Sequence, residues 1–189
     1  EGLNRAGERG WSPPLLLQAR LRFSPAGGQL AGTAGLGFCS RGRGRSGHDG
    51  LRRLQWLWFY YASPASVVSL LPGPPHGLKT SALGETGGRL AATAVTPLLQ
   101  AQGASAGRPL PAVEMSLSRS LMTGWHTVRL AWLPHVAVFV VDGQQVLQTR
   151  LVPMRPLVLM AWMDNVCMRL NDEGLSEVGA EAVPEPQCL

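Results

Sequence analysis

The chain has 189 residues, a length that suits one β-sandwich domain built around a single core. Its 23 glycines and 15 prolines recur at short intervals, which favours short strands joined by turns and argues against long helices. The net charge of +5 comes almost wholly from arginine, since Lys79 is the only lysine, and no apolar run reaches the length of a membrane helix.

Three segments in the first third of the chain predict strands. Residues 15–24 end in an alternation of apolar and basic side chains, which is typical of a half-buried strand. Residues 27–38 are glycine-rich and predict a turn and a short strand, because no helix follows that would complete a phosphate-binding loop. Residues 54–61 hold five aromatic residues in eight and predict a central strand buried on both faces.

The middle of the chain, residues 62–111, is polar, small and rich in proline. Short strands are expected around residues 78–83 and 90–98, and residues 100–111 are the best candidate for a long loop. An arginine-rich stretch precedes the aromatic segment, but residues 40–50 contain no aromatic residue on which a base could stack. We therefore expect a solvated loop and no nucleic-acid partner. Its arginines are Arg41, Arg43, Arg45, Arg52 and Arg53.

The clearest pattern lies between residues 125 and 165, where several strands follow one another. Residues 126–132 alternate between apolar and polar side chains, and Asp142-Gly143 between two apolar runs is a strong β-hairpin signal. Residues 157–165 then predict another buried strand. The core is expected to span about residues 15–170, and the acidic, proline-containing tail, 171–189, is expected to lie along the surface.

The three cysteines, Cys39, Cys167 and Cys188, are odd in number and lack the Cys-x-x-Cys spacing of a zinc site. We expect reduced thiols, no metal and no cofactor. The N-terminus shows no basic region followed by an apolar run, so a soluble cytoplasmic protein is expected. Because the chain starts at Glu1 without Met, removal of a leader peptide remains an open alternative.

Several motifs resemble those of a known fold family. Three features follow one another: Trp-His at 125–126 with Trp132, Phe-Val-Val-Asp-Gly at 139–143, and a proline-flanked strand after it. Over about residues 15–170, this pattern resembles the concanavalin A-like lectin and glucanase superfamily. More narrowly, GTAGLGF, LWFYYASP, GWHTVRLAW, VDGQQV, MDN and PEPQ resemble a group of bacterial jelly-roll proteins without an assigned activity. That group would have aromatic residues where this chain has Cys39 and Cys188. The resemblance implies an all-β jelly-roll sandwich of two antiparallel sheets, forming one domain over 1–189.

The same resemblance argues against glycosidase chemistry. Laminarinase-type enzymes carry two or three acids on one strand, because retaining hydrolysis needs carboxyl groups about 5 to 5.5 Å apart. No such strand exists here, and the strand nearest that position in chain order, residues 54–61, contains no acid. Whether the chain is an enzyme of another type stays open.

Aromatic residues are the candidates for ligand binding. Rigid aromatic side chains on a concave sheet suit stacking against sugar rings or other small molecules. Two alternatives remain: these residues fill the core between the sheets, or the opposite face of the same strand, with Leu57, Phe59 and Tyr61, lines the groove instead. The candidates are Trp56, Trp58, Tyr60 and Trp162.

Three polar residues are further candidates. His126 shares a strand face with apolar residues, so a hydrogen-bonded core histidine is favoured over a site residue. Asp164 and Asn165 end a strand, where capping a turn is favoured over binding calcium. A lyase would need a base and a carboxylate neutraliser, for which Tyr60, His126 and Arg129 qualify by type, although Arg129 points away from His126 on a regular strand.

Three functional hypotheses follow. The first, which we favour because the glycosidase acids are absent, is a noncatalytic module that binds a carbohydrate or small molecule on an aromatic concave face. The second is an unusual lyase or isomerase, which predicts a closed apolar cavity holding His126, Tyr60 or Asp164. The third is a structural protein with an exposed apolar patch for a partner. The oligomeric state stays open.

Overall fold

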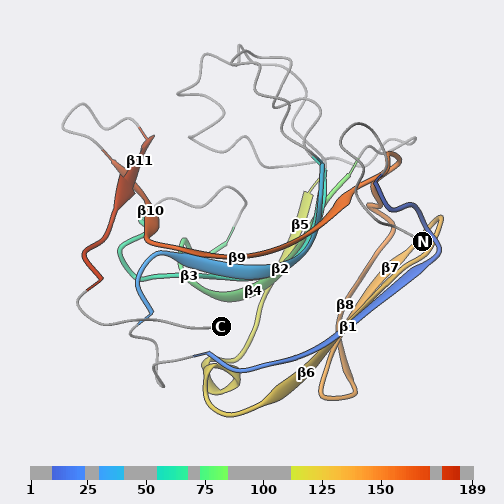
Figure 1. Ribbon diagram of the computed structural model, residues 1–189, viewed down its shortest axis with the longest axis horizontal. Coiled ribbons are helices and arrows are strands. Elements are labelled where there is room, and N and C mark those ends of the chain that lie inside the picture. Colours follow the sequence, from blue (N-terminus) through green and yellow to red (C-terminus); the bar gives the residue numbers. More distant parts are fainter. Residues whose placement is uncertain are drawn as a thin grey trace.

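The computed structural model describes residues 10–23, 30–40, 55–67, 73–84, 112–170 and 176–183. These residues form a four-stranded and a five-stranded antiparallel sheet packed face to face, and a separate two-stranded hairpin (Figure 1). Within these ranges the only helical segment is a short 3₁₀ turn, Arg119–Met122. The predicted fold class, an all-β jelly-roll sandwich of two antiparallel sheets, is confirmed.

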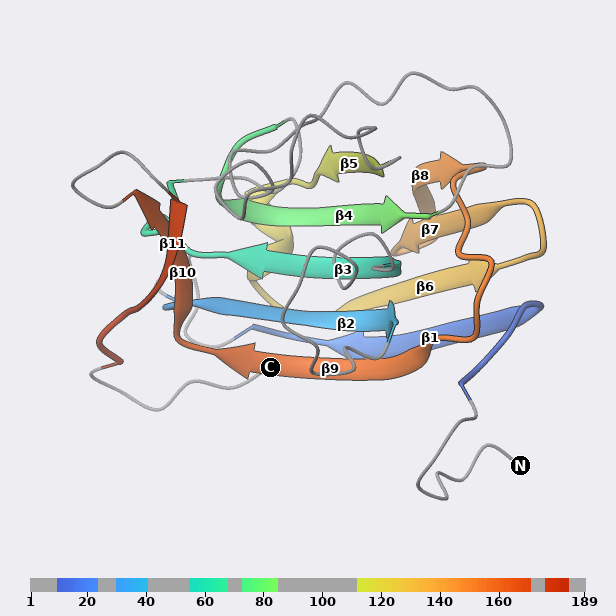
Figure 2. The ribbon, with the colours of Figure 1, turned by 90° about the horizontal axis from the view of Figure 1, so that it is seen from above.

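In the four-stranded sheet the strands lie side by side in the order in which they occur in the sequence, whereas in the five-stranded sheet the last strand along the chain lies beside the first, as Figure 2 shows from above. The four-stranded sheet consists of β1 (Leu15–Leu21), β6 (His126–Trp132), β7 (Ala137–Val141) and β8 (Gln144–Thr149), in that order. The five-stranded sheet consists of β5 (Ala112–Ser116), β4 (Gly77–Leu83), β3 (Trp56–Ala62), β2 (Thr33–Cys39) and β9 (Val158–Asp164), in that order. The hairpin consists of β10 (Val166–Leu170) and β11 (Ser176–Ala180).

The main core fills the space between the two sheets. Leu57 and Phe59 of β3 point into it, and the Phe59 ring meets Phe139 of β7 edge-on, with centroids 5.2 Å apart. Leu130 and Trp132 of β6 are 0% exposed, as the alternation of residues 126–132 predicted. Burying each such side chain contributes roughly 1.5–3 kcal/mol.

The predicted hairpin is confirmed between β7 and β8. Asp142 and Gly143 both have positive φ, 49° and 82°. Those values belong to a type I′ turn, whose twist matches that of the flanking strands. The residue types at this turn therefore fix the register next to it, where Val140 pairs with Gln145, and a bulge then shifts the pairing so that Phe139 lies opposite Leu147.

Several predictions made from the sequence differ from the structure. Residues 27–38 were expected to give only a short strand, but β2 runs for seven residues between β3 and β9. The strand expected to be buried at 157–165 is β9, which is an edge strand with Leu159 49% exposed. The residues after 170 were expected to lie as a tail, but 176–180 pair with β10 as a hairpin strand. Residues 78–83 form β4 as predicted.

Other predictions concern residues outside the described ranges. They are the arginine-rich stretch with Arg41, Arg43, Arg45, Arg52 and Arg53, the strand at 90–98, the loop at 100–111 and Cys188. Within the described ranges, no helix has the length and apolar character needed to cross a membrane.

Candidate functional site

The candidate site lies on the concave face, the side of the five-stranded sheet turned away from the four-stranded sheet (Figure 1). Because side chains alternate along a strand, Trp56, Trp58 and Tyr60 point to this face while Leu57 and Phe59 point into the core. The alternative in which Trp56, Trp58 and Tyr60 fill the space between the sheets is wrong. The alternative in which the opposite face of the strand, with Leu57 and Phe59, lines the groove is also wrong.

The pairing register arranges the concave face in rows that run across the strands. Each row takes one residue from each neighbouring strand. The first row is Val158, Cys39, Trp56, Leu83 and Ala112; the second is Met160, Gly37, Trp58, Ser81 and Glu114; the third is Trp162, Gly35, Tyr60, Lys79 and Ser116. The predicted ligand-binding residues, which come from two strands far apart in the sequence, therefore lie together on one surface.

The aromatic residues of this face contact one another as a continuous platform. The rings of Trp56 and Trp58 are stacked, with centroids 4.6 Å apart and an interplanar angle of 8°. Trp162 is tilted by 57° against Trp58 at 5.0 Å, and Tyr60 meets Trp58 edge-on at 6.4 Å. Trp56 is 7% exposed, whereas Trp58, Tyr60 and Trp162 are half-buried and keep some surface open.

Trp162 is held in place by the strand beside it. Its indole lies over Gly35 of β2, where an added Cβ would come within 2.2 Å of the ring. Its Nε1 donates a hydrogen bond to Thr33 Oγ1 over 2.9 Å. The glycine leaves the space and the threonine fixes the ring's orientation, so the platform is arranged before any ligand arrives.

A polar cluster borders the platform on β4 and β5. Lys79 Nζ lies 3.1 Å from Glu114 Oε1, and both side chains are nearly inaccessible, at 1% and 2% exposed. The Tyr60 hydroxyl donates a hydrogen bond to Glu114 Oε2, and Lys79 also donates to the Pro74 carbonyl. Lys79 Nζ lies 5.6 Å from the Tyr60 ring centre, within reach of a cation–π contact.

This environment keeps the Tyr60 phenol protonated. Burial, followed by the charge of Glu114 and the hydrogen bond to it, raises the Tyr60 pKa far above its ordinary value. Tyr60 is therefore a hydrogen-bond donor here and is poorly suited to act as a base. Two buried atoms on the same face, Trp58 Nε1 and Glu114 Oε1, have no hydrogen-bond partner, although the second is ion-paired with Lys79.

Sequence reasoning missed Lys79 and Glu114. The strand β5 was not predicted, because its five residues give too short an alternation to be distinguished from a loop. One signal was available: Lys79 is the only lysine and sits within a predicted strand of small and apolar residues. A charge in such a strand calls for a buried partner.

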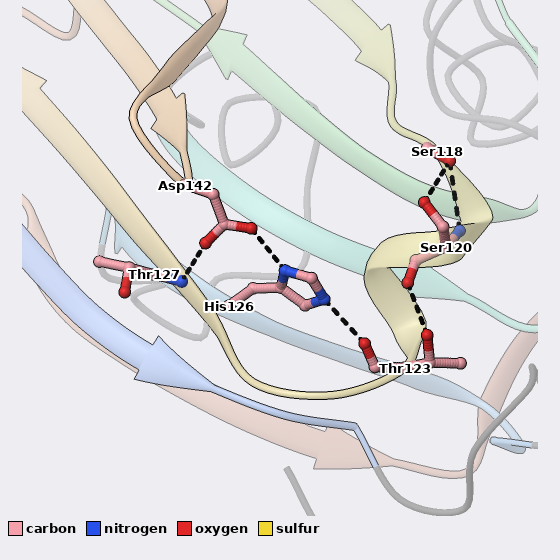
Figure 3. Close-up of polar contacts among 6 residues, drawn as sticks. All are labelled: Ser118, Ser120, Thr123, His126, Thr127 and Asp142. Atoms are coloured by element: carbon pink, nitrogen blue, oxygen red, sulfur yellow. Dashed lines mark hydrogen bonds and ion pairs between the residues drawn. The ribbon is translucent and has the colours of Figure 1, made fainter.

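His126 lies on the other sheet, away from the concave face. Its Nδ1 is 2.6 Å from Asp142 Oδ2 and its Nε2 is 2.8 Å from the Thr123 carbonyl oxygen, while Asp142 Oδ1 accepts a hydrogen bond from the Thr127 backbone (Figure 3). The side chain is 18% exposed, so it is a hydrogen-bonded histidine at the rim of the core. The hydrogen bond that His126 donates to Asp142 raises the His126 pKa, and the same bond lowers the Asp142 pKa.

The lyase set predicted from residue types does not assemble. Tyr60 lies on the concave face, whereas His126 and Arg129 belong to β6 in the opposite sheet, where Arg129 Nε donates to Gln18 Oε1. His126 does border an apolar cavity between the sheets, together with Leu36 and Phe59, but the volume of about 20 Å³ is that of a single small molecule such as water.

Asp164 and Asn165 connect the sandwich to the hairpin. Asp164 Oδ1 accepts hydrogen bonds from the Thr33 hydroxyl over 2.9 Å and from the Val166 backbone over 3.0 Å, as expected for a residue that caps a turn. Asn165 Nδ2 donates to the Glu181 backbone carbonyl. The Glu181 carboxylate in turn accepts a hydrogen bond from the Gly32 backbone over 2.6 Å.

Two of the three cysteines lie within the described ranges, and both are buried thiols without a disulfide. Cys39 lies in the first row of the concave face beside Trp56, and burial raises its pKa. A raised pKa suppresses the thiolate, so neither nucleophilic nor metal-binding chemistry is favoured at Cys39.

Comparisons with known proteins give a distant structural likeness. No protein-family model matches the chain, and no curated protein matches it in sequence. Two solved structures are similar: a native glycosidic hydrolase at 14% identity with a TM-score of 0.38, and a β-glucanase of Bacillus licheniformis at 14% identity with a TM-score of 0.36. Each alignment covers 82% of this chain but only 52% and 53% of the other chain, so the chain spans about half the length of these structures.

Proposed function

We propose that the protein is a noncatalytic carbohydrate-binding β-sandwich, with the concave face as its binding surface. The observation that carries this proposal is the pair Trp58 and Trp162, two half-buried indoles in contact at 5.0 Å on a preformed platform. The apolar face of a sugar ring stacks on such rings at little cost in side-chain entropy.

The polar groups beside the platform suit a ligand rich in hydroxyl groups. In the second row of the face, Trp58 Nε1 has no hydrogen-bond acceptor, whereas Glu114 Oε1 is ion-paired with Lys79. A ligand hydroxyl that reaches the edge of this indole would supply the missing acceptor. Leaving the indole N–H unpaired costs about 1–3 kcal/mol.

The spacing of the acids argues against hydrolysis of the bound sugar. Within the described residues, the alternation of the strands gives the concave face two carboxylates, Glu114 on β5 and Asp164 on β9. These are the two edge strands of the sheet, four strand spacings or roughly 19 Å apart. Paired-carboxylate mechanisms need separations of about 5 to 9.5 Å.

The test is a titration of the purified protein with neutral oligosaccharides: β-glucans, xylans and mannans of several lengths. We expect at least one of them to raise the melting temperature, because a ligand that binds only the folded state stabilises it. Trp58→Ala and Trp162→Ala should each weaken binding at least tenfold, in line with the loss of one aromatic contact of about 1.5 kcal/mol.

The matched control is Trp11→Ala, since Trp11 is 39% exposed and lies outside the concave face. This variant should bind like the unchanged protein. Trp58→Ala should also cost less than the ~3–5 kcal/mol that removing a core tryptophan costs. Equal loss of binding in Trp11→Ala, or no binding of any sugar by the unchanged protein, contradicts the proposal. Either result favours the alternative in which a partner protein covers the exposed side chains of Met160 and Leu159.

A further inference from the structure

The outward side of the four-stranded sheet carries a second surface, the arginine face, made of Arg20, Arg22, Arg129 and Trp125. All four side chains are exposed. The register pairs Gln18 with Arg129 and Arg20 with Thr127, so Arg20 and Arg129 are diagonal neighbours on adjacent strands, roughly 7 Å apart. Like charges at that distance repel one another unless an anion lies between them.

Neighbouring side chains hold these arginines in position. The guanidinium groups of Arg20 and Arg22 each lie 5.2 Å from the centre of the Trp125 ring, and that indole is 54% exposed. Arg129 Nε donates to Gln18 Oε1 over 2.8 Å, which leaves the donors of its two terminal NH₂ groups for a ligand. The donors are therefore partly ordered before a ligand binds.

No carboxylate of the described residues pairs with these three arginines. The nearest acid in the register is Asp142, but its two oxygens accept from His126 and from the Thr127 backbone. The positive charge of the arginine face is thus left uncompensated by the described part of the fold, in a protein whose net charge is already +5.

We propose that the arginine face binds an acidic polysaccharide, through carboxylate or sulfate groups repeated along the chain. Guanidinium groups bind such oxyanions with two parallel hydrogen bonds, and adjacent arginines can take successive acidic groups of an extended chain. A single-stranded nucleic acid fits less well, because the arginine face offers successive bases one aromatic ring, Trp125, over which two guanidinium groups already lie. This surface lies on the opposite side of the sandwich from the concave face and does not depend on the function proposed there.

The experiment measures binding of the full chain to polygalacturonate and to heparin, with neutral dextran as the uncharged reference. We expect binding to both acidic glycans, weakening as salt is raised, and none to dextran. The double variant Arg20→Gln/Arg129→Gln should lower the affinity at least tenfold, the loss expected for charged hydrogen bonds. Arg20→Lys/Arg129→Lys keeps the charge but loses the paired geometry and should lose severalfold.

Two control variants separate binding at the arginine face from attraction by net charge and from binding at the concave face. Arg150→Gln removes one charge at the exposed residue after β8, at the opposite edge of the sheet, and should change the affinity less than twofold, whereas Arg129→Gln, which also removes one charge, should lower it severalfold. Trp58→Ala should bind acidic glycans normally. An equal loss of affinity in Arg150→Gln would show that net charge alone attracts the glycans. Tighter binding of poly(dT) or of phosphatidylglycerol vesicles than of either glycan would identify a different partner. Either result overturns the proposal.

Discussion

The two outward faces of the sandwich use their positive charges in opposite ways. On the concave face, Lys79 is 1% exposed and is paired with the equally buried Glu114. On the arginine face, Arg20 and Arg129 are exposed and no described carboxylate pairs with them. Water solvates an exposed charge, whereas a buried charge needs a partner inside the protein. The first charge is therefore part of the structure, and the others are free to bind something else.

The tryptophans differ in the same way. Trp58 and Trp162 pack against each other and against Trp56 and Tyr60, and they keep part of their ring faces open. Trp125 is more exposed, but cations lie over its ring. The tryptophans of the concave face thus offer a surface for stacking, whereas Trp125 of the arginine face supports charged donors. The two faces should respond to different ligands and different substitutions.

Breaking the buried ion pair should have the largest effect. Lys79→Met leaves the Glu114 carboxylate buried without its cation, and we expect the free energy of unfolding to fall by about 3–5 kcal/mol. Replacing an exposed arginine, as in Arg150→Gln, should change it by less than about 0.5 kcal/mol. Denaturation in urea, followed by fluorescence, measures both.

The double variant Lys79→Met/Glu114→Gln sharpens this prediction. It removes both charges, so its loss of stability should be clearly smaller than the sum of the two single losses. Single variants that unfold like the unchanged protein would mean that water solvates this pair and that the contrast between the two faces does not exist.

The contrast between inward and outward residues was accessible from the sequence only in part. Alternation correctly placed Val128, Leu130 and Trp132 on the core side of β6, and Asp142-Gly143 correctly marked a hairpin. Both signals are local, since they depend on neighbouring residues in one strand or one turn. The polar cluster is not local, because Tyr60 and Glu114 meet only through the pairing of β3, β4 and β5.

Strand order explains the remaining differences. Residues 157–165 look apolar enough for a central strand, but β9 lies at an edge, where Leu159 and Met160 stay exposed. Trp56, Trp58 and Tyr60 share one face of β3, as its alternation predicts, and the sequence left open whether that face or the opposite one lines the groove. Only the position of the second sheet, against Leu57 and Phe59, decides between them.

Gly35→Ala should have an intermediate effect, confined to the concave face. The new Cβ would lie 2.2 Å from the Trp162 ring, so the indole must move and its hydrogen bond to Thr33 is lost. We expect a loss of about 1–3 kcal/mol, as for other overpacked sites, together with weaker binding of neutral sugars and unchanged binding of acidic glycans. Calorimetry and the same titrations measure these changes.

The companion variant Gly35→Ala/Trp162→Ala tests the cause. Once the indole is gone, the new methyl group no longer meets the ring, so the double variant should be as stable as Trp162→Ala alone. If the two losses simply add, the glycine serves the backbone of β2 and not the position of Trp162.

The smallest expected effect concerns the rim of the four-stranded sheet, where pH decides the strength of the contact between His126 and Asp142. The His126 pKa is raised in the folded state, so its contribution is complete below the unfolded value of about 6.5 and disappears as the pH rises through the folded value. The Asp142 pKa is lowered, so its contribution is present above about pH 4 and disappears as the pH falls further. The pair should stabilise the fold most between these two values.

His126→Gln should therefore lower the melting temperature more at about pH 5.5 than at about pH 8.5. The corresponding difference in the free energy of unfolding should be below about 1 kcal/mol, because Asp142 is exposed. Asp142→Asn should reproduce the effect, since it removes the other half of the same contact. A decrease that is equal at both pH values would show that His126 acts through packing at the rim of the core and not through its charge. Sugar binding at Trp58 and Trp162 should be the same in both variants, because this contact lies on the other sheet.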